Sequence, residues 1–291
     1  MTETLIRAFA FAFGAVWGSF LNVCISRWPA GLSVVTPRSR CPNCERPIEW
    51  YENIPVLSWI ALRARCRGCG QPISIVYPLV ELAVAFAWLA SVAHFGPTLT
   101  ALRVAVFVTL LIGIAMTDAL HYTIPDGFTV FGLLWMMTFS VVGVMAGETG
   151  PFALPYEALI GACAGAGAIS IAGWLGEVAL RKEAMGFGDV TLMAVIGAAV
   201  GPRLALLTIF LAAALGTVAY VLIIYPIRLV RLNRERRERR ERRGSLGPPA
   251  DDDGVVPVIP FGVFLAPAAV IALLWGQAMI AWYLESLVNY G

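Results

Sequence analysis

Long apolar stretches are the feature that most limits how this chain can fold. A helix needs about 20 apolar residues to cross the ~30 Å hydrocarbon core of a bilayer. The chain is 59% hydrophobic and only 14% charged, far from the composition of a soluble domain. We therefore expect an all-α polytopic membrane protein. Its apolar runs predict eight membrane-spanning helices, the sixth of them short, at residues 5–25, 77–95, 99–117, 127–146, 157–180, 189–201, 204–227 and 259–284.

The basic residues gather in three of the connections between these runs. Of 21 Lys and Arg residues, 18 lie in residues 27–67, 181–182 and 228–243, which are the first, fifth and seventh connections. Loops rich in Lys and Arg stay on the cytoplasmic side of a membrane. By alternation the third connection, residues 118–126, faces the same side although it contains no Lys or Arg.

Isolated aspartates lie at the ends of the apolar runs on this predicted cytoplasmic side. The chain contains six, and the three outside residues 251–253 are Asp118, Asp126 and Asp189. A charge at the centre of a membrane helix costs about 2.5–3.5 kcal/mol on insertion scales, so an acid in or beside the bilayer marks a candidate functional site.

The local sequence separates these three acids. Pro125 disfavours helix at the residue before it, so one helix should end near Asp118 and another begin near Asp126, which resembles an N-cap. Asp189 follows the flexible segment Gly186–Phe187–Gly188 at the start of another span. We expect Asp118 and Asp189 to form a catalytic pair of unequal acidity, a general acid and a general base sharing one water. The alternative for Asp118 is a plain membrane-boundary residue.

Four cysteines lie between the first two apolar runs. Two Cys-x2-Cys segments, separated by 21 residues, supply Cys41, Cys44, Cys66 and Cys69. This spacing is typical of a tetrahedral four-thiolate Zn²⁺ site, which leaves no open position and is structural. The alternative is a pair of disulfides, but thiols on the cytoplasmic side stay reduced. We expect a first transmembrane helix over residues 1–25 and a cytoplasmic zinc-binding loop over residues 26–76.

An ordered set of segments resembles the bacterial type IV prepilin peptidases, a family of GxGD-type membrane aspartic proteases. The segments in this sequence that carry the resemblance are Gly18–Val23, Pro37–Cys44, Glu52–Trp59, Tyr77–Glu81, Ile124–Asp126, Gly186–Asp189 and Ile259–Gly262, with Asp118 and the second cysteine pair. One departure is Thr191, where many family members have Lys.

The resemblance implies a function and a site. Asp118 and Asp189 would be the catalytic aspartates, and Asp126 would not. The enzyme would remove short basic leader peptides from type IV prepilins or type II secretion pseudopilins at the cytoplasmic face of the inner membrane. Family members with the large cysteine-bearing loop also N-methylate the new amino terminus with S-adenosylmethionine, whose binding residues the sequence does not indicate. Residues 77–291 would be the helical membrane protease core, with a flexible charged linker at residues 231–256.

Two other functions fit some of the same residues. In a proton- or cation-coupled transporter, Asp118 and Asp189 would bind ions and the zinc loop would be a docking module, but the sequence shows no internal repeat of spans. A pilus-assembly scaffold would need no catalysis. The expected partners are prepilin or pseudopilin substrates and membrane lipid, with no nucleic acid, and the sequence leaves the oligomeric state open.

Overall fold

The computed structural model describes residues 2–148, 150–181, 185–226 and 260–289. Within this part of the chain, seven helices are long and apolar enough to cross a membrane. The expected all-α polytopic membrane protein is thus confirmed. The long helices are α1 (Thr2–Arg27), α3 (Val76–Phe95), α4 (Leu99–His121), α5 (Asp126–Met145), α6 (Pro155–Leu180), α7 (Phe187–Ala219) and α9 (Gly262–Asn289).

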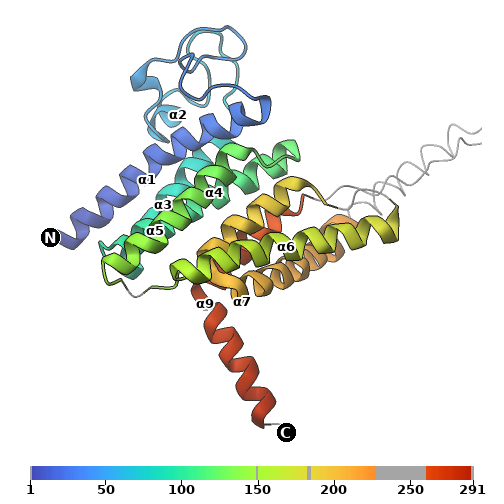
Figure 1. The fold of residues 1–291 in the computed structure, drawn as a ribbon. Helices are drawn as coiled ribbons and strands as arrows, with labels where there is room; N and C mark the ends of the chain where they lie inside the picture. Colours follow the sequence, from blue (N-terminus) through green and yellow to red (C-terminus); the bar gives the residue numbers. More distant parts are fainter. Residues whose placement is uncertain (1, 149, 182–184, 227–259, 290–291) are drawn as a thin grey trace, which may run out of the picture.

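The arrangement of these helices places a small module at one end of the bundle (Figure 1). The module comprises residues 28–75, between α1 and α3, and has three short helical elements, η1 (Trp28–Ala30), η2 (Trp50–Glu52) and α2 (Leu57–Ala61). Helices α1, α3, α4 and α5 pack together, and α6, α7 and α9 pack beside them. A π-helical turn, η3 (Tyr220–Ile224), follows α7. The predicted linker at 231–256 lies outside the described residues.

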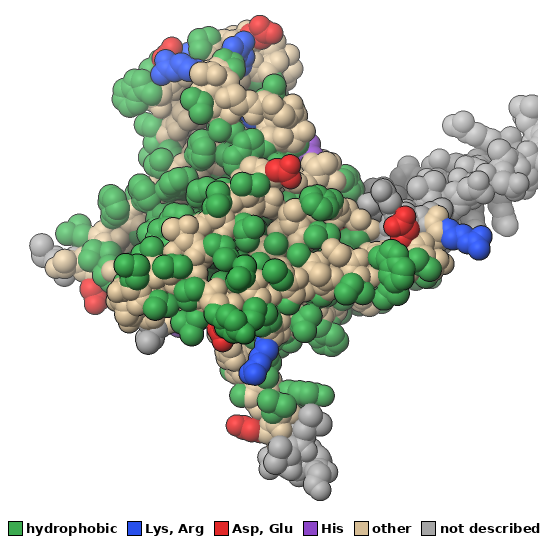
Figure 2. Space-filling model, in the orientation of Figure 1, with side chains coloured by type: hydrophobic (Ala, Val, Ile, Leu, Met, Phe, Trp, Pro, Cys, Tyr) green, Lys and Arg blue, Asp and Glu red, His purple; other side chains and the backbone are tan. Residues whose placement is uncertain are grey.

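The outer surface of the bundle suits a lipid environment. Phe9, Leu134 and Phe210 expose 69%, 63% and 70% of their surface. Figure 2 shows apolar side chains over much of the visible face of the bundle, with charged side chains mainly on the module and at the margins. Large exposed apolar areas are unusual on a soluble monomer. Here they are the surface that lipid would cover.

The predicted sixth and seventh spans, residues 189–201 and 204–227, fall largely within α7. This helix is interrupted at Gly201, whose φ of 81° and ψ of 172° are not helical, and Pro202 follows. Glycine tolerates a positive φ that other residues rarely adopt, and proline removes a helical hydrogen bond. The sequence therefore places a break in the helix at the boundary between the two runs.

The chain reverses direction at this break. The backbone approaches of three glycines show this reversal. If Gly188 carried a side chain, its Cβ would lie 2.8 Å from Ile124, and a Cβ added to Gly262 would lie 3.2 Å from the same Ile124 side chain. Near the other end of α7, a Cβ on Gly216 would lie 3.5 Å from Phe264. Both ends of α7 are thus close to the start of α9, although a straight helix would separate Gly188 from Gly216 by about 42 Å. Helix α7 therefore runs out and back.

The connection between α4 and α5 differs in one detail from the prediction. Helix α4 ends at His121, where Tyr122 is left-handed and donates its backbone N–H to the Asp118 carbonyl at 2.9 Å. Helix α5 begins at Asp126, but Pro125 is the cap residue and no side chain caps the helix. The predicted N-cap role of Asp126 is wrong. Its exposed carboxylate instead lies in the first turn, where the helix dipole favours negative charge.

Candidate active site and metal centre

The four predicted metal ligands lie together at the centre of the module. The sulfur atoms of Cys41, Cys44, Cys66 and Cys69 are all within 4.8 Å of one another. The Cys41 and Cys69 sulfurs are 3.8 Å apart, and those of Cys44 and Cys66 are 4.0 Å apart. Four thiolates bound at about 2.3 Å to a tetrahedral ion would be about 3.8 Å from one another. The group could therefore hold a metal ion.

Each Cys-x2-Cys segment forms the same kind of turn. Cys41 donates its backbone N–H to the Arg46 carbonyl at 3.0 Å, and Cys66 donates to the Gln71 carbonyl at 2.8 Å. An isolated antiparallel bridge closes each turn, at residues 40 and 47 and at residues 65 and 72. The backbone N–H groups of Cys44 and Asn43 lower the pKa of Cys41 to about 6. A thiol of this acidity is readily available as a thiolate ligand.

One carboxylate joins the two turns. Glu52, whose side chain is 5% exposed, pairs with Arg46 of the first turn at 3.0 Å and with Arg67 of the second at 3.5 Å. The hydrogen bond from Arg46 holds the pKa of Glu52 below its usual range. Glu52 therefore remains ionised and links the halves of the cysteine site.

Asp118 lies in the last turn of α4 and is 6% exposed. Its Oδ2 accepts the backbone N–H of Val263 at 3.2 Å. A Cβ on Gly262 would lie 2.8 Å from the same oxygen. The start of α9 thus packs directly against the carboxylate, and residue 262 has no room for a larger side chain.

Asp189 lies in the first turn of α7 and is partly buried. The preceding residue, Gly188, packs against Ile124, which also contacts the start of α9 beside Asp118. Gly262, which lies against Asp118, and Gly188, which precedes Asp189, both contact the Ile124 side chain. The structure therefore brings together two acids that are 71 residues apart in the sequence.

Sequence reasoning missed the residues that surround this pair. Ile124, Gly262 and the Val263 backbone contact the acids or their neighbours. The signal was present, because Ile124 and Gly262 belong to two of the segments that carry the family resemblance. Their contact with Asp118 requires helix ends distant in the sequence to meet, which spacing alone does not show.

The described residues form a bundle of long apolar helices, two of which carry a carboxyl at ends that meet near Ile124, and this arrangement is that of a multi-pass membrane protein. Family comparisons agree with this class. Residues 12–95 match the Bacterial Peptidase A24 N-terminal domain, and residues 105–221 match the Type IV leader peptidase family. The chain belongs to the type IV leader peptidase family.

Several relatives are described as prepilin leader peptidase/N-methyltransferase. One from Myxococcus xanthus is 40% identical over 76% of this chain and 64% of its own length. One from Stutzerimonas stutzeri is 33% identical over 95% of this chain and 93% of its own, and one from Pseudomonas aeruginosa is 33% identical over 94% and 91%. No solved structure matches. The chain spans just under two thirds of the Myxococcus relative and nearly all of the other two.

Proposed function

We propose that this chain is a membrane-embedded aspartic endopeptidase. It removes the short basic leader peptide from type IV prepilins or type II secretion pseudopilins at the cytoplasmic face of the inner membrane, and it N-methylates the new amino terminus. The observation that carries the proposal is the position of Asp118 and Asp189 at two helix ends that meet at Ile124, because Gly262, which lies against Asp118, and Gly188, which precedes Asp189, both contact this side chain. The family membership and the names of the relatives support the substrate class.

The proposed cytoplasmic orientation rests on the position of the basic module. Trp28, directly after α1, packs on the start of α5. The centroids of the Trp28 and Phe128 rings are 4.4 Å apart, and a Cβ added to Gly127 would lie 2.7 Å from the Trp28 ring. The same end of α5 adjoins the loop that contains Ile124. The module and the acid pair are therefore at one end of the bundle, and the positive-inside rule assigns that end to the cytoplasm.

The proposed mechanism uses the acids as one unit. One carboxylate takes a proton from a water molecule, which attacks the scissile carbonyl carbon, while the other carboxyl, protonated, donates to the carbonyl oxygen. One water is consumed and one peptide bond is broken. The buried position of Asp118 and its bond from Val263 fix one oxygen of the pair. Because the carboxyls share protons, their apparent pKa values belong to the pair.

The substrate would fit this location. A prepilin presents a basic leader followed by an apolar helix, so its helix can lie in the bilayer with the leader in the cytosol. The cleavage site then meets the membrane at the level of the helix ends that carry Asp118 and Asp189. A transporter would use the same acids, but the family membership favours hydrolysis.

The four cysteines would hold Zn²⁺ as a structural ion. Four thiolates at this spacing fit zinc and leave it no open position. Zinc would supply folding free energy to the module, which has few buried apolar side chains of its own. The hydrolytic step involves none of these cysteines.

Purified protein in detergent, incubated with a prepilin, tests the proposed function. Asp118→Ala and Asp189→Ala should each abolish loss of the leader, whereas Asp126→Asn, at an exposed acid outside the pair, should retain it. A mass spectrum of the product reports cleavage and methylation together. Leader cleavage by either alanine variant would refute the proposed catalytic roles of Asp118 and Asp189. Proton flux without cleavage would favour the transporter.

A further inference from the structure

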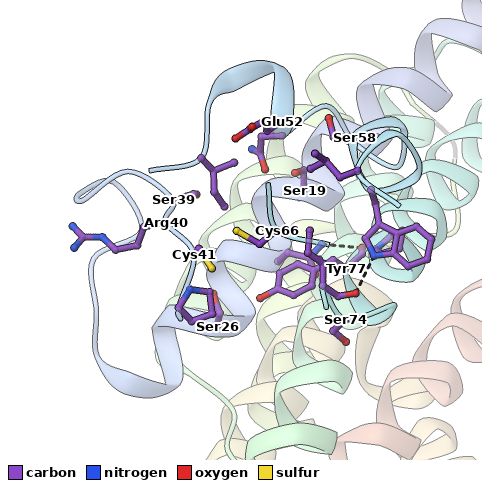
Figure 3. Close-up of a pocket in the computed structure, with 18 of the residues that line it drawn as sticks. Ser19, Ser26, Ser39, Arg40, Cys41, Glu52, Ser58, Cys66, Ser74 and Tyr77 are labelled. Atoms are coloured by element: carbon purple, nitrogen blue, oxygen red, sulfur yellow. Dashed lines mark hydrogen bonds between the residues drawn. The ribbon is translucent and has the colours of Figure 1, made fainter. Parts of the chain in front are cut away.

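The short helix α2 of the module has two chemically different faces. Ser58, Trp59 and Leu62 line a cavity of about 610 Å³ between the module and the adjoining ends of α1 and α3 (Figure 3). Leu57 and Ile60 lie on the other face, outside the lining of that cavity, and expose 65% and 60% of their surface. Residues three apart share one side of a helix, so these two form an outward apolar face.

A hydrogen bond fixes the depth of α2 relative to the membrane. Val56, directly before α2, donates its backbone N–H to Glu81 Oε2 at 2.7 Å. Glu81 is five residues from Val76, the first residue of the apolar helix α3, and lies about 7.5 Å along its axis. The start of α2 is therefore level with the first turns of α3. Amphipathic helices bind membranes at this depth, with their apolar face about 5–10 Å into the boundary between headgroups and acyl chains.

The other end of α2 is held by the segment that leads into α3. Two consecutive left-handed residues, Arg63 and Ala64, turn the chain there, with φ of 52° and 57°. Ala64 donates its N–H to the Trp59 carbonyl at 2.9 Å and accepts the N–H of Ile73 at 2.7 Å. The Trp59 indole N–H donates to the Ile73 carbonyl at 3.1 Å. Because both ends of α2 are fixed, the direction of its outward face is fixed as well.

The apolar surface of the bundle reaches this part of the module. Ile75, Leu79 and Phe86 are exposed and lie on one side of α3 and the residue before it. Their row begins two residues after Ile73, which holds α2. Figure 2 shows apolar side chains on the module as well as on the bundle. The surface that lipid would cover on the bundle therefore extends to the level of α2.

Positive charge follows the apolar face directly. Arg63 and Arg65 are exposed, and among the described residues no ion pair includes either of them. Basic residues beside an apolar helix face bind the headgroups of anionic lipids. An acidic protein in the aqueous phase would complement the arginines, but it would leave Leu57 and Ile60 uncovered at the depth of the bilayer. A lipid surface complements the charge and the apolar face together.

We propose that α2 and the turn after it form a lipid-binding surface. Leu57 and Ile60 lie among the acyl chains next to the headgroups, and Arg63 and Arg65 bind the phosphates of anionic lipids. The module therefore rests on the bilayer and is not suspended in the cytosol. Because the inner face of the same helix lines the cavity, lipid contact also fixes that cavity wall. This inference concerns the module alone and does not depend on peptidase activity.

Photo-crosslinking of the full chain tests the apolar contact. Zinc-loaded protein with benzoylphenylalanine in place of Ile60 is reconstituted into nanodiscs of phosphatidylcholine and phosphatidylglycerol and irradiated. Residue 60 should gain the mass of a phospholipid. The control places the same probe at Arg40, which is exposed and lies apart from Ser58 of α2 (Figure 3), and it should gain none. No lipid adduct at residue 60, equal adducts at both positions, or an adduct to a second protein chain would overturn the proposal.

Zinc release to a chromogenic chelator tests the charge, and it begins with the unaltered protein. Lipid that binds the folded module stabilises it. The wild type should therefore release zinc about tenfold more slowly in nanodiscs that contain phosphatidylglycerol than in phosphatidylcholine alone. Arg63→Gln/Arg65→Gln should lose most of this difference, whereas Arg40→Gln should keep it. No difference in the wild type, or the same difference in all three proteins, would overturn the proposed binding of anionic lipid.

Discussion

At the scale of single residues, Gly262 is the most constrained neighbour of the acid pair. A Cβ there would lie 2.8 Å from Asp118 Oδ2, closer than side chains tolerate. Gly262→Ala should push the carboxylate or the start of α9 out of place, and a misplacement of about 1 Å can cost ~10²-fold in rate. We expect a fall of about that size in kcat/KM for leader cleavage, measured on purified enzyme.

The control for this variant is Gly216→Ala, which also faces the start of α9. A Cβ there would lie 3.5 Å from Phe264, an ordinary contact. This variant should cleave at the wild-type rate. Equal activity of the two alanine variants would show that the packing of α9 against Asp118 does not matter for the reaction.

The proposed sharing of one water by Asp118 and Asp189 makes a second prediction. Groups that act as a unit lose their function together, so their losses are not additive. The double variant Asp118→Asn/Asp189→Asn should be about as slow as either single variant, in single-turnover assays of leader cleavage. A double variant slowed by the product of the two single effects would indicate independent roles.

At the scale of elements, the module depends on the Glu52 bridge between its cysteine turns. Because Arg46 lowers the pKa of Glu52, the bridge stabilises the module at pH values above the unfolded pKa of the carboxyl, and this contribution is lost as the pH falls through the lowered folded pKa. Glu52→Gln should release zinc to a chromogenic chelator several times faster than the wild type at neutral pH. Glu49→Gln, at the exposed neighbouring acid, should not. Equal release rates would contradict the role of the bridge.

Helices α6 and α7 pack backbone to backbone at Gly161 and Gly197. A Cβ on either residue would collide with the carbonyl oxygen of the other. Backbone atoms cannot move aside as a flexible side chain can, so Gly161→Val should destabilise the fold by about 3 kcal/mol or more, at the upper end of overpacking effects. Thermal unfolding in detergent measures the loss.

Gly167→Val in the same helix is the control, because a Cβ there meets no atom within 4 Å. Both variants carry the same cost of valine in a helix, so the difference between them isolates the contact with α7. An equal fall in melting temperature in both variants would show that the contact between Gly161 and α7 contributes nothing extra to stability.

The sequence predicted these elements better than the contacts between them. Apolar runs located the spans, Pro202 coincided with the break in α7, and cysteine spacing anticipated the thiolate cluster, because each signal is local. The bond from Val263 to Asp118 joins residues 145 apart, and the bond from Val56 to Glu81 joins a loop to a helix. Such contacts depend on helix packing, which one sequence does not reveal. The sequence predicted Asp126 as the N-cap of α5, whereas the cap is Pro125, one residue earlier. An aspartate is favourable both at the cap and in the first turn of a helix, so its presence does not distinguish the two positions.

At the scale of the whole molecule, the reversal of α7 determines the side on which the chain ends. With α7 crossing twice, the described chain makes eight crossings, and a cytoplasmic module then places both of its ends in the periplasm. With a single crossing of α7, α9 would end in the cytoplasm. Alkaline phosphatase, which is active only in the periplasm, fused after Asn289 should therefore be active. Fusions after Gly147, which should be active, and after Arg181, which should be inactive, calibrate the assay. Inactive enzyme after Asn289, with both calibrating fusions as expected, would mean that α7 crosses the membrane only once.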